Sequence, residues 1–267
     1  MNRLERLFAA SRRAKGKALV VYVCAGDPDL ETTERLVPAL AEAGADVIEL
    51  GVPFSDPLAD GPTIQAASQR ALAAGTSLTA VLGLVRKLRR AGTTVPIVLF
   101  GYMNPILRMG LERFVNEAAD AGADGVLVAD LPLEESEALS ALALAKKLSL
   151  VLLAAPTTPP ERLLAIGKAT RGFLYFVSVT GVTGARSELP PNLPKKLAEV
   201  RAATTAAVAV GFGVSTPEQA RALAAHADAV VVGSALVEAL HRGGADPSAA
   251  LALVRSLAEA VHSQAVH

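Results

Sequence analysis

Residues that serve common catalytic chemistries are scarce in this sequence or poorly placed for them. Cys24 is the only cysteine, so no disulfide can form within the chain, and its apolar surroundings are typical of a small core residue. A protein without disulfides is expected in a reducing compartment such as the cytoplasm. All four histidines fall in the last part of the chain and none ends a predicted strand, so neither a histidine metal site nor a Ser-His triad is expected.

The chain also lacks an excess of charge and a long apolar run. Its formal net charge is +0 and its pI is about 6.9, which gives no electrostatic reason to bind nucleic acid or an anionic membrane. No apolar stretch reaches the roughly 18 residues that span a bilayer. Residues 2–17 combine Arg and Lys with Leu4, Leu7 and Phe8, as a transit peptide does, but a strand-like run begins directly at Ala18. We therefore expect residues 1–16 to form a retained amphipathic helix that packs on the domain.

The apolar residues that are present fall into short, regularly spaced runs. Eight runs have the composition of buried strands: 18–24, 45–50, 95–100, 124–129, 149–155, 172–178, 207–211 and 228–232. Helical periodicity fills the segments between them, and the sequence Ala-Gly-Ala-Asp precedes two of the runs, at 43–46 and 121–124. This alternation predicts one domain over residues 1–267, an α/β fold with a single (β/α)8 TIM barrel. A doubly wound sheet is the alternative, but residues 24–27 lack its glycine motif.

In such barrels the active site lies in the loops that follow the strands. A Schiff-base mechanism has no residue to use there, because every lysine lies in a predicted helix or on the approach to a strand: Lys15, Lys17, Lys87, Lys146, Lys147, Lys168, Lys195 and Lys196. Near the strand ends the sequence instead supplies acids and tyrosines: Asp27, Glu49, Asp56, Asp60, Asp130, Tyr22, Tyr102 and Tyr175.

Residues 46–63 contain the strongest candidate for chemistry. Glu49 stands near the end of an apolar strand, where burial should raise the pKa of its carboxyl group. A general acid/base that works near neutral pH is made in this way. A strand-end acid paired with a neighbouring Arg would have the same sequence, so both interpretations stand at this point. The loop that follows holds two further acids, Asp56 and Asp60.

Glycines after the last two predicted strands form a second pattern. Gly211-Phe212-Gly213 follows the seventh strand, and Gly233-Ser234 follows the eighth and begins a helix. Loops in these two positions, together with a helix N-terminus, make the usual phosphate site of a barrel, because glycine lets backbone N–H groups approach the phosphate oxygens. The segment 180–186, rich in Thr and Gly and ending in Arg186, could add donors from a mobile loop. We therefore predict a phosphate site at these strand ends.

The sequence resembles the α subunit of tryptophan synthase. Residues 50–65, Leu-Gly-Val-Pro-Phe-Ser-Asp-Pro-Leu-Ala-Asp-Gly-Pro-Thr-Ile-Gln, match the diagnostic motif of that family. Further matches follow in the family's order at 24–28, 101–105, 128–132, 178–186, 211–214 and 233–235. The resemblance covers almost the whole chain and implies a (β/α)8 barrel. It also implies a carbon–carbon lyase that cleaves indole-3-glycerol phosphate to indole and glyceraldehyde 3-phosphate in tryptophan biosynthesis, with no cofactor in this chain.

The resemblance also implies roles for individual residues. Glu49 would be the general acid/base, and Asp60, kept ionised by solvent on its loop, would pair with the indole N–H; Tyr175 would be a substrate-side neighbour of Glu49. The remaining substrate-binding residues would be Tyr22, Ile64, Phe100, Tyr102, Thr183, Gly184, Gly211, Phe212, Gly213, Gly233 and Ser234. Position 22 often holds Phe in this family, so the Tyr22 hydroxyl is a departure. Asp130 would order its loop.

The family works with a pyridoxal-phosphate β subunit in an α2β2 heterotetramer, to which indole passes. The residues that would face this partner are Pro53, Asp56, Asn104 and Pro105. An Asp that only orders a proline-rich turn is the alternative interpretation of Asp56. Two further functions stay open from the sequence: a free-standing lyase that needs no partner, and a regulatory subunit that binds the phosphate ligand and activates β. The second is disfavoured by the intact acids and Tyr175.

Overall fold

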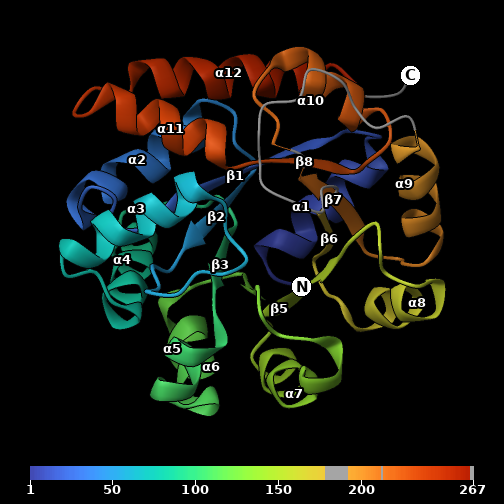
Figure 1. Ribbon diagram of the computed structural model, residues 1–267, viewed down its shortest axis with the longest axis horizontal. Coiled ribbons are helices and arrows are strands. Elements are labelled where there is room, and N and C mark those ends of the chain that lie inside the picture. Colours follow the sequence, from blue (N-terminus) through green and yellow to red (C-terminus); the bar gives the residue numbers. More distant parts are fainter. Residues whose placement is uncertain (178–191, 212, 265–267) are drawn as a thin grey trace.

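The protein is a closed barrel of eight parallel strands in sequence order, surrounded by helices (Figure 1). The computed structural model describes residues 1–177, 192–211 and 213–264. The strands are β1 (Ala18–Cys24), β2 (Val47–Gly51), β3 (Ile97–Gly101), β4 (Gly125–Val128), β5 (Ser149–Ala154), β6 (Phe173–Val177), β7 (Ala207–Gly211) and β8 (Ala229–Val232). Each predicted run overlaps one of them, with β2 and β3 ending one residue beyond their runs, and the predicted (β/α)8 barrel is confirmed.

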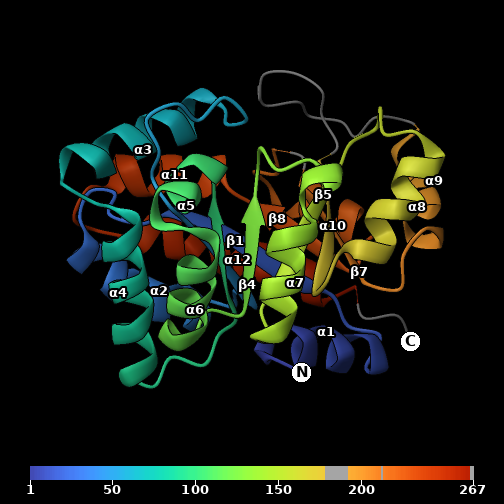
Figure 2. The same cartoon turned by 90° about the horizontal axis from the view of Figure 1, so that it is seen from below.

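Helices follow the strands and cover the outside of the barrel (Figures 1 and 2). They are α1 (Arg3–Arg13), α2 (Leu30–Glu42), α3 (Pro62–Ala73), α4 (Leu78–Arg90), α5 (Met103–Met109), α6 (Leu111–Ala121), α7 (Glu137–Ala145), α8 (Pro160–Ala169), α9 (Leu193–Ala202), α10 (Pro217–Ala224), α11 (Ser234–Gly243) and α12 (Ser248–His262), with a 3-10 turn at Leu133–Glu135. Short polar side chains start several of them. Asp29, Ser77 and Thr216 each accept a hydrogen bond from a backbone N–H in the first turn. Within the described residues no single helix is long and apolar enough to cross a membrane, and only the bent pair α3 and α4, at 91°, meets that test jointly.

An Asp just before β2, β4 and β8 fastens each of these strands to the preceding strand at the barrel's N-terminal end. The carboxylates of Asp46, Asp124 and Asp228 accept hydrogen bonds from the backbone N–H of Leu19, Ile97 and Val208, at 2.7, 3.0 and 2.9 Å. Each carboxylate also faces a basic side chain: His262 at 2.8 Å from Asp46, Arg89 at 2.7 Å from Asp124, and Arg201 at 3.3 Å from Asp228. The repeat therefore has a physical cause, because the same contact recurs between successive strands.

The apolar side chains form two layers, one inside the barrel and one between the strands and the helices. Along β2, Ile48 and Leu50 belong to the outer core between strands and helices, whereas Val47 belongs to the core inside the barrel. Since side chains alternate along a strand, Glu49 and Gly51 also face inward. Glu49, the one acidic residue of β2, therefore faces the interior of the barrel, above the apolar layer that contains Val47.

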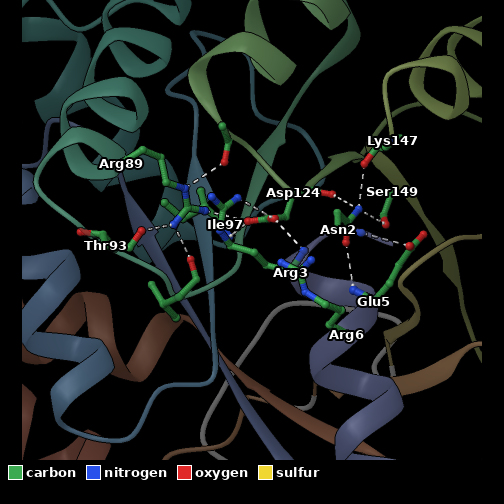
Figure 3. A network of polar contacts seen from close by, with 12 residues as sticks. Asn2, Arg3, Glu5, Arg6, Arg89, Thr93, Ile97, Asp124, Lys147 and Ser149 are labelled. Atoms are coloured by element: carbon green, nitrogen blue, oxygen red, sulfur yellow. Dashed lines mark hydrogen bonds and ion pairs between the residues drawn. The ribbon is translucent and has the colours of Figure 1, made fainter.

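Helix α1 closes the N-terminal end of the barrel (Figure 2). Leu4 and Phe8 are buried in the inner core, and the Phe8 ring lies 5.7 Å from that of Phe173 on β6. Polar contacts fasten the start of the helix (Figure 3). The Asn2 side-chain amide donates to Asp124 O, Lys147 O and Ser149 Oγ at 2.8 to 2.9 Å. The bottom of the barrel is therefore filled with side chains, and the open end is the opposite one.

Candidate active site

A cavity of about 200 Å³ opens at the carboxyl ends of the strands. It is lined by Tyr22, Glu49, Ala59, Asp60, Gly61, Ile64, Phe100, Ala129, Leu153, Tyr175, Val177, Gly211, Gly213, Val231, Gly233 and Ser234. Most of the residues predicted from the sequence to bind substrate or to act in catalysis therefore meet at one place. Thr183, Gly184 and Phe212 lie outside the described residues.

Glu49 is the most unusual group in the cavity. It is only 1% exposed, and its Oε1 atom is buried without a hydrogen-bond partner among the described residues. No described Arg or Lys forms a salt bridge with it, so within this part of the chain the Arg-paired interpretation finds no support. Burial raises the pKa of its carboxyl group to about 8. The group is thus predominantly protonated at neutral pH, yet close enough to titration to give and take a proton.

Asp60 lies on the loop between β2 and α3 and enters the cavity from the rim. Its Oδ2 accepts a hydrogen bond of 2.9 Å from the Tyr102 hydroxyl. Burial raises the pKa of Asp60 to about 6, although the Tyr102 hydrogen bond acts in the opposite direction. The expectation that solvent keeps this pKa low was wrong, because the side chain is turned toward the cavity and is only partly exposed. Asp60 is still predominantly ionised at neutral pH, whereas Glu49 is not.

Aromatic and apolar side chains form the walls of the cavity. Tyr22 on β1 packs edge-on against Phe100 on β3, with ring centroids 5.4 Å apart, and Ile64 on α3 joins the same buried cluster. Tyr175 on β6 is on the wall as well. Burial raises the pKa of both Tyr22 and Tyr175, so their hydroxyls stay protonated, and the Glu49 carboxyl lies near enough to contribute to both shifts.

The glycines predicted to hold phosphate lie together at the mouth. Gly211 ends β7, Gly213 follows with a φ of +64°, and Gly233 stands directly before α11. The space where a side chain of Gly213 would stand is open. Ser234 is the first residue of α11, so the N-terminus of a ten-residue helix faces the cavity with its free N–H groups. The arrangement suits an anion of the size of a phosphate.

Tyr102 and the residues predicted to face a partner lie outside the cavity. Tyr102 does not line the cavity; it is buried behind the wall, where its hydroxyl bonds to the loop that carries Asp60. Pro53 is buried in the isolated chain, whereas Asp56 and Asn104 are exposed and Pro105 is half-buried. Asp130 was predicted to order its own loop; it is exposed and accepts a 2.8 Å hydrogen bond from the backbone N–H of Met103, so it holds the start of α5.

Six further residues line the cavity that were not predicted from the sequence: Ala59, Gly61, Ala129, Leu153, Val177 and Val231. Four of these stand at or just after the carboxyl end of a strand, in the inward-facing alternation. Applying that alternation to every strand end would have found them. Among the described residues, no three His, Cys, Asp or Glu side chains come together in a way that could hold a metal ion.

A (β/α)8 barrel that holds a carboxyl group, unpaired among the described residues, in a cavity at the ends of its strands is the framework of an acid/base enzyme. Comparison with known proteins specifies which one. A model of the family described as tryptophan synthase alpha chain matches residues 8–266. The tryptophan synthase alpha chain of Pelobacter propionicus is 51% identical over 98% of both chains, and that of Geobacter sulfurreducens is 53% identical over 91% of both.

Solved structures agree with the sequence relatives. Tryptophan synthase subunit alpha from Legionella pneumophila superposes with a TM-score of 0.92 at 38% identity, covering 98% of this chain and 99% of that one. A chain of Mycobacterium tuberculosis tryptophan synthase gives 0.90 at 38% identity, covering 98% of both chains. This chain belongs to the tryptophan synthase alpha chain family. It is a carbon–carbon lyase of tryptophan biosynthesis that cleaves indole-3-glycerol phosphate and works with a beta subunit, and the family is one without a cofactor of its own.

Proposed function

We propose that Glu49 and Asp60 divide the chemistry of indole-3-glycerol phosphate cleavage between them. The observation that carries this proposal is the pair of opposite charge states in one cavity. The buried, unpartnered Glu49 has a pKa near 8, whereas the hydrogen-bonded Asp60 has a pKa near 6. Between these values one carboxyl group carries a proton and the other is a carboxylate. Two acids whose environments separate their pKa values in this way perform different tasks.

The retro-aldol reaction uses each charge state in turn. The neutral Glu49 carboxyl donates its proton to C3 of the indole ring, which leaves positive charge at the ring nitrogen. The Asp60 carboxylate stabilises that charge by pairing with the ring N–H. The Glu49 carboxylate then removes the proton of the side-chain hydroxyl on the carbon next to C3. The bond between this carbon and C3 breaks, its electron pair returns to the ring, and indole and glyceraldehyde 3-phosphate result with Glu49 protonated again.

The other cavity residues would hold the substrate in place for these transfers. Tyr22, Phe100 and Ile64 offer flat and apolar surfaces for the indole ring. Tyr175 would position the reacting side chain beside Glu49. Gly213, Gly233 and Ser234 would bind the phosphate through backbone N–H groups and the start of α11, with Gly211, Phe212, Thr183 and Gly184 completing the cradle.

We propose that the beta subunit docks on the surface formed by the β2–α3 loop and α5, in an α2β2 heterotetramer. A groove of about 570 Å³ lies there, and Pro53, Asn104 and Pro105 line it. Leu58 and Leu107, on the two segments, are 92% and 55% exposed, which is typical of a surface that a partner covers. The pyridoxal phosphate of the second reaction would reside in the beta subunit. A cytoplasmic location would fit the single, buried, unpaired Cys24.

The test is the release of glyceraldehyde 3-phosphate from indole-3-glycerol phosphate, measured for the wild type and for Glu49→Gln, each with and without a beta subunit. Gln keeps the size of Glu49 but cannot exchange a proton, so kcat should fall by roughly 10²–10⁴-fold in both settings. Activity of the wild type should rise when the beta subunit is added. High activity that ignores the beta subunit would instead identify a free-standing lyase, and a fully active Glu49→Gln would refute the role of Glu49.

A further inference from the structure

The Tyr102 side chain binds two consecutive residues of the β2–α3 loop. Its hydroxyl donates a hydrogen bond of 2.9 Å to Asp60 Oδ2 and accepts one of 3.1 Å from the backbone N–H of Ala59. Tyr102 is only 4% exposed, so its hydroxyl is largely shielded from water, and both bonds are partly buried. A hydrogen bond to a carboxylate in such surroundings is stronger than one between neutral groups. The Tyr102 hydroxyl therefore fixes both the backbone and the carboxylate at the point where Asp60 enters the cavity.

The Tyr102 ring holds the other end of the same loop. It stacks on Phe54, with ring centroids 5.2 Å apart and planes 29° from parallel. The backbone of Phe54 is in turn fastened to α3, because its N–H donates to Ser68 Oγ at 2.8 Å and its carbonyl oxygen accepts from the same hydroxyl at 3.1 Å. One side chain from the end of β3 thus contacts the loop at Phe54 and again at Ala59 and Asp60.

Tyr102 also stands directly before α5 and leads the chain into it. It is the residue that precedes Met103, whose backbone N–H is held by Asp130 at 2.8 Å. The short helix that follows carries Asn104, Pro105 and the exposed Leu107, which belong to the proposed docking surface. The backbone of Tyr102 is the covalent connection between β3 and α5, so a shift of α5 that a partner causes acts directly on Tyr102.

We propose that Tyr102 is a positioning residue that places Asp60 for catalysis and couples this placement to the docking surface on α5. Tyr102 touches neither the cavity nor the reacting atoms; it acts through the Asp60 carboxylate. The inference rests on the role of Asp60 proposed above, and it adds a residue and a route by which partner docking changes the lyase reaction. Docking on α5 would tighten the hydrogen bond that orients Asp60 toward the indole nitrogen.

The electrostatic consequence of the contact has a definite sign. The titratable groups that face Asp60 are Tyr22 and Cys24 on β1, Glu49 on β2, Tyr175 on β6 and Tyr102 itself. Of these, Tyr102 donates the hydrogen bond that favours the carboxylate form. Removing this donor raises the pKa of Asp60, so the acid limb of the pH profile of kcat/KM moves to higher pH.

The variant Tyr102→Phe tests the proposal, because Phe retains the ring stacked on Phe54 and loses only the hydroxyl. With the beta subunit present, we expect kcat/KM to fall about tenfold, mainly in kcat, and the acid limb to move upward. The fold-activation by the beta subunit should also decrease. Ser68→Ala is the matched control: it loosens the same loop at Phe54 without touching Asp60, so its acid limb should coincide with that of the wild type. A wild-type acid limb and wild-type activation in Tyr102→Phe would overturn the proposal.

A double-mutant cycle with Asp60→Asn separates this inference from the proposed function. If Tyr102 acts through Asp60, adding Tyr102→Phe to Asp60→Asn should lower kcat/KM no further than Asp60→Asn alone. Additive losses would show that Tyr102 acts independently and would refute the positioning role. Full activity of Asp60→Asn would refute the proposed function itself, together with the inference built on it. The folded fraction of each variant is measured by circular dichroism, and each kcat/KM is divided by it before the comparison. A general loss of folded protein in Tyr102→Phe then does not imitate a loss of catalysis.

Discussion

The Tyr22 hydroxyl occupies the place where a side chain of Gly51 would stand. A Cβ atom added at Gly51 would lie 2.2 Å from Tyr22 Oη and 2.5 Å from the ring carbon that bears it. Tyr22 is the register partner of Glu49, so its ring leans over the residue two positions farther along the neighbouring strand. Tyr175 repeats this relationship on the other side of the barrel: its partner is Ala209, and a Cβ at Gly211 would lie 2.5 Å from its hydroxyl.

We predict that Gly51→Ala damages the cavity by displacing Tyr22 rather than by changing the backbone. The new methyl group cannot be accommodated without moving the tyrosine ring, which would then enter the space for the indole ring. We expect kcat/KM to fall by about 10–100-fold. Steady-state kinetics with indole-3-glycerol phosphate measures the loss. In the double variant Gly51→Ala/Tyr22→Leu, the shorter side chain no longer reaches position 51, and part of the activity should return. A double variant slower than Gly51→Ala alone would contradict this account.

The pH dependence of kcat/KM should be bell-shaped. The reaction needs an ionised Asp60 and a protonated Glu49, whose pKa values are about 6 and about 8. The rate should therefore fall below pH 6 as Asp60 is protonated, and above pH 8 as Glu49 loses its proton. Profiles measured with the beta subunit at constant ionic strength would test this. An activity that stays constant from pH 5 to pH 9 would show that these two groups do not control the reaction.

The stability of the fold should change with pH because of Glu49. Its pKa is about 8 in the folded chain and about 4.5 in the unfolded one, so the unfolded state releases the proton first as pH rises. Stability is therefore lost between pH 4.5 and pH 8, and the loss amounts to roughly 5 kcal/mol above that window. Glu49→Gln removes this term. Urea unfolding should find the variant equal to the wild type near pH 4 and several kcal/mol more stable at pH 8, and equal stability at pH 8 would refute the burial argument.

The network around Asp124 should matter for stability and not for catalysis (Figure 3). Asp124 is fully buried and accepts hydrogen bonds from Arg89, Ile97 N and both the backbone and side chain of Arg3. Asp124→Ala leaves Arg89, itself largely buried, without its partner, which should cost about 3–5 kcal/mol. Arg3→Ala is the control, since this side chain is 39% exposed and its loss should cost less than about 1 kcal/mol. Denaturant titration gives both values, and kcat/KM of the folded fraction should stay within about twofold of the wild type.

The strands could be predicted from the sequence because both faces of each are buried, which leaves an uninterrupted apolar run. The predicted boundaries were early by one or two residues at β2 and β3, where the runs were started at Ala45 and Val95. Asp46, just before β2, contacts Leu19 of β1 twice: its backbone N–H donates to the Leu19 carbonyl oxygen and its carboxylate accepts from the Leu19 N–H. Helix α5 was not predicted, because two helical turns give too short a periodic pattern to recognise.

The raised pKa of Glu49 was predictable, whereas the surroundings of Asp60 were not. The first follows from a local pattern, a carboxylate within an apolar strand. The second depends on Tyr102, which is 42 positions away and reaches Asp60 because β2 and β3 pair side by side, which brings the segments after their carboxyl ends together. Sequence spacing contains no information about such a contact, so Asp60 was assigned a solvent-exposed environment and Tyr102 a place beside the indole ring. The diagonal placement of Tyr22 over Gly51 likewise requires the strand register.

The filled floor of the barrel has a consequence for the passage of small molecules. Among the described residues, α1 and the inner apolar layer close the cavity toward the N-terminal end of the barrel, and the cavity opens at the carboxyl ends of the strands. Neither indole nor glyceraldehyde 3-phosphate can therefore leave through the floor of the barrel. The β2–α3 loop carries Asp60, which lines the cavity, so a partner seated on that loop is expected to influence the exchange of substrate and products without contacting the reacting atoms.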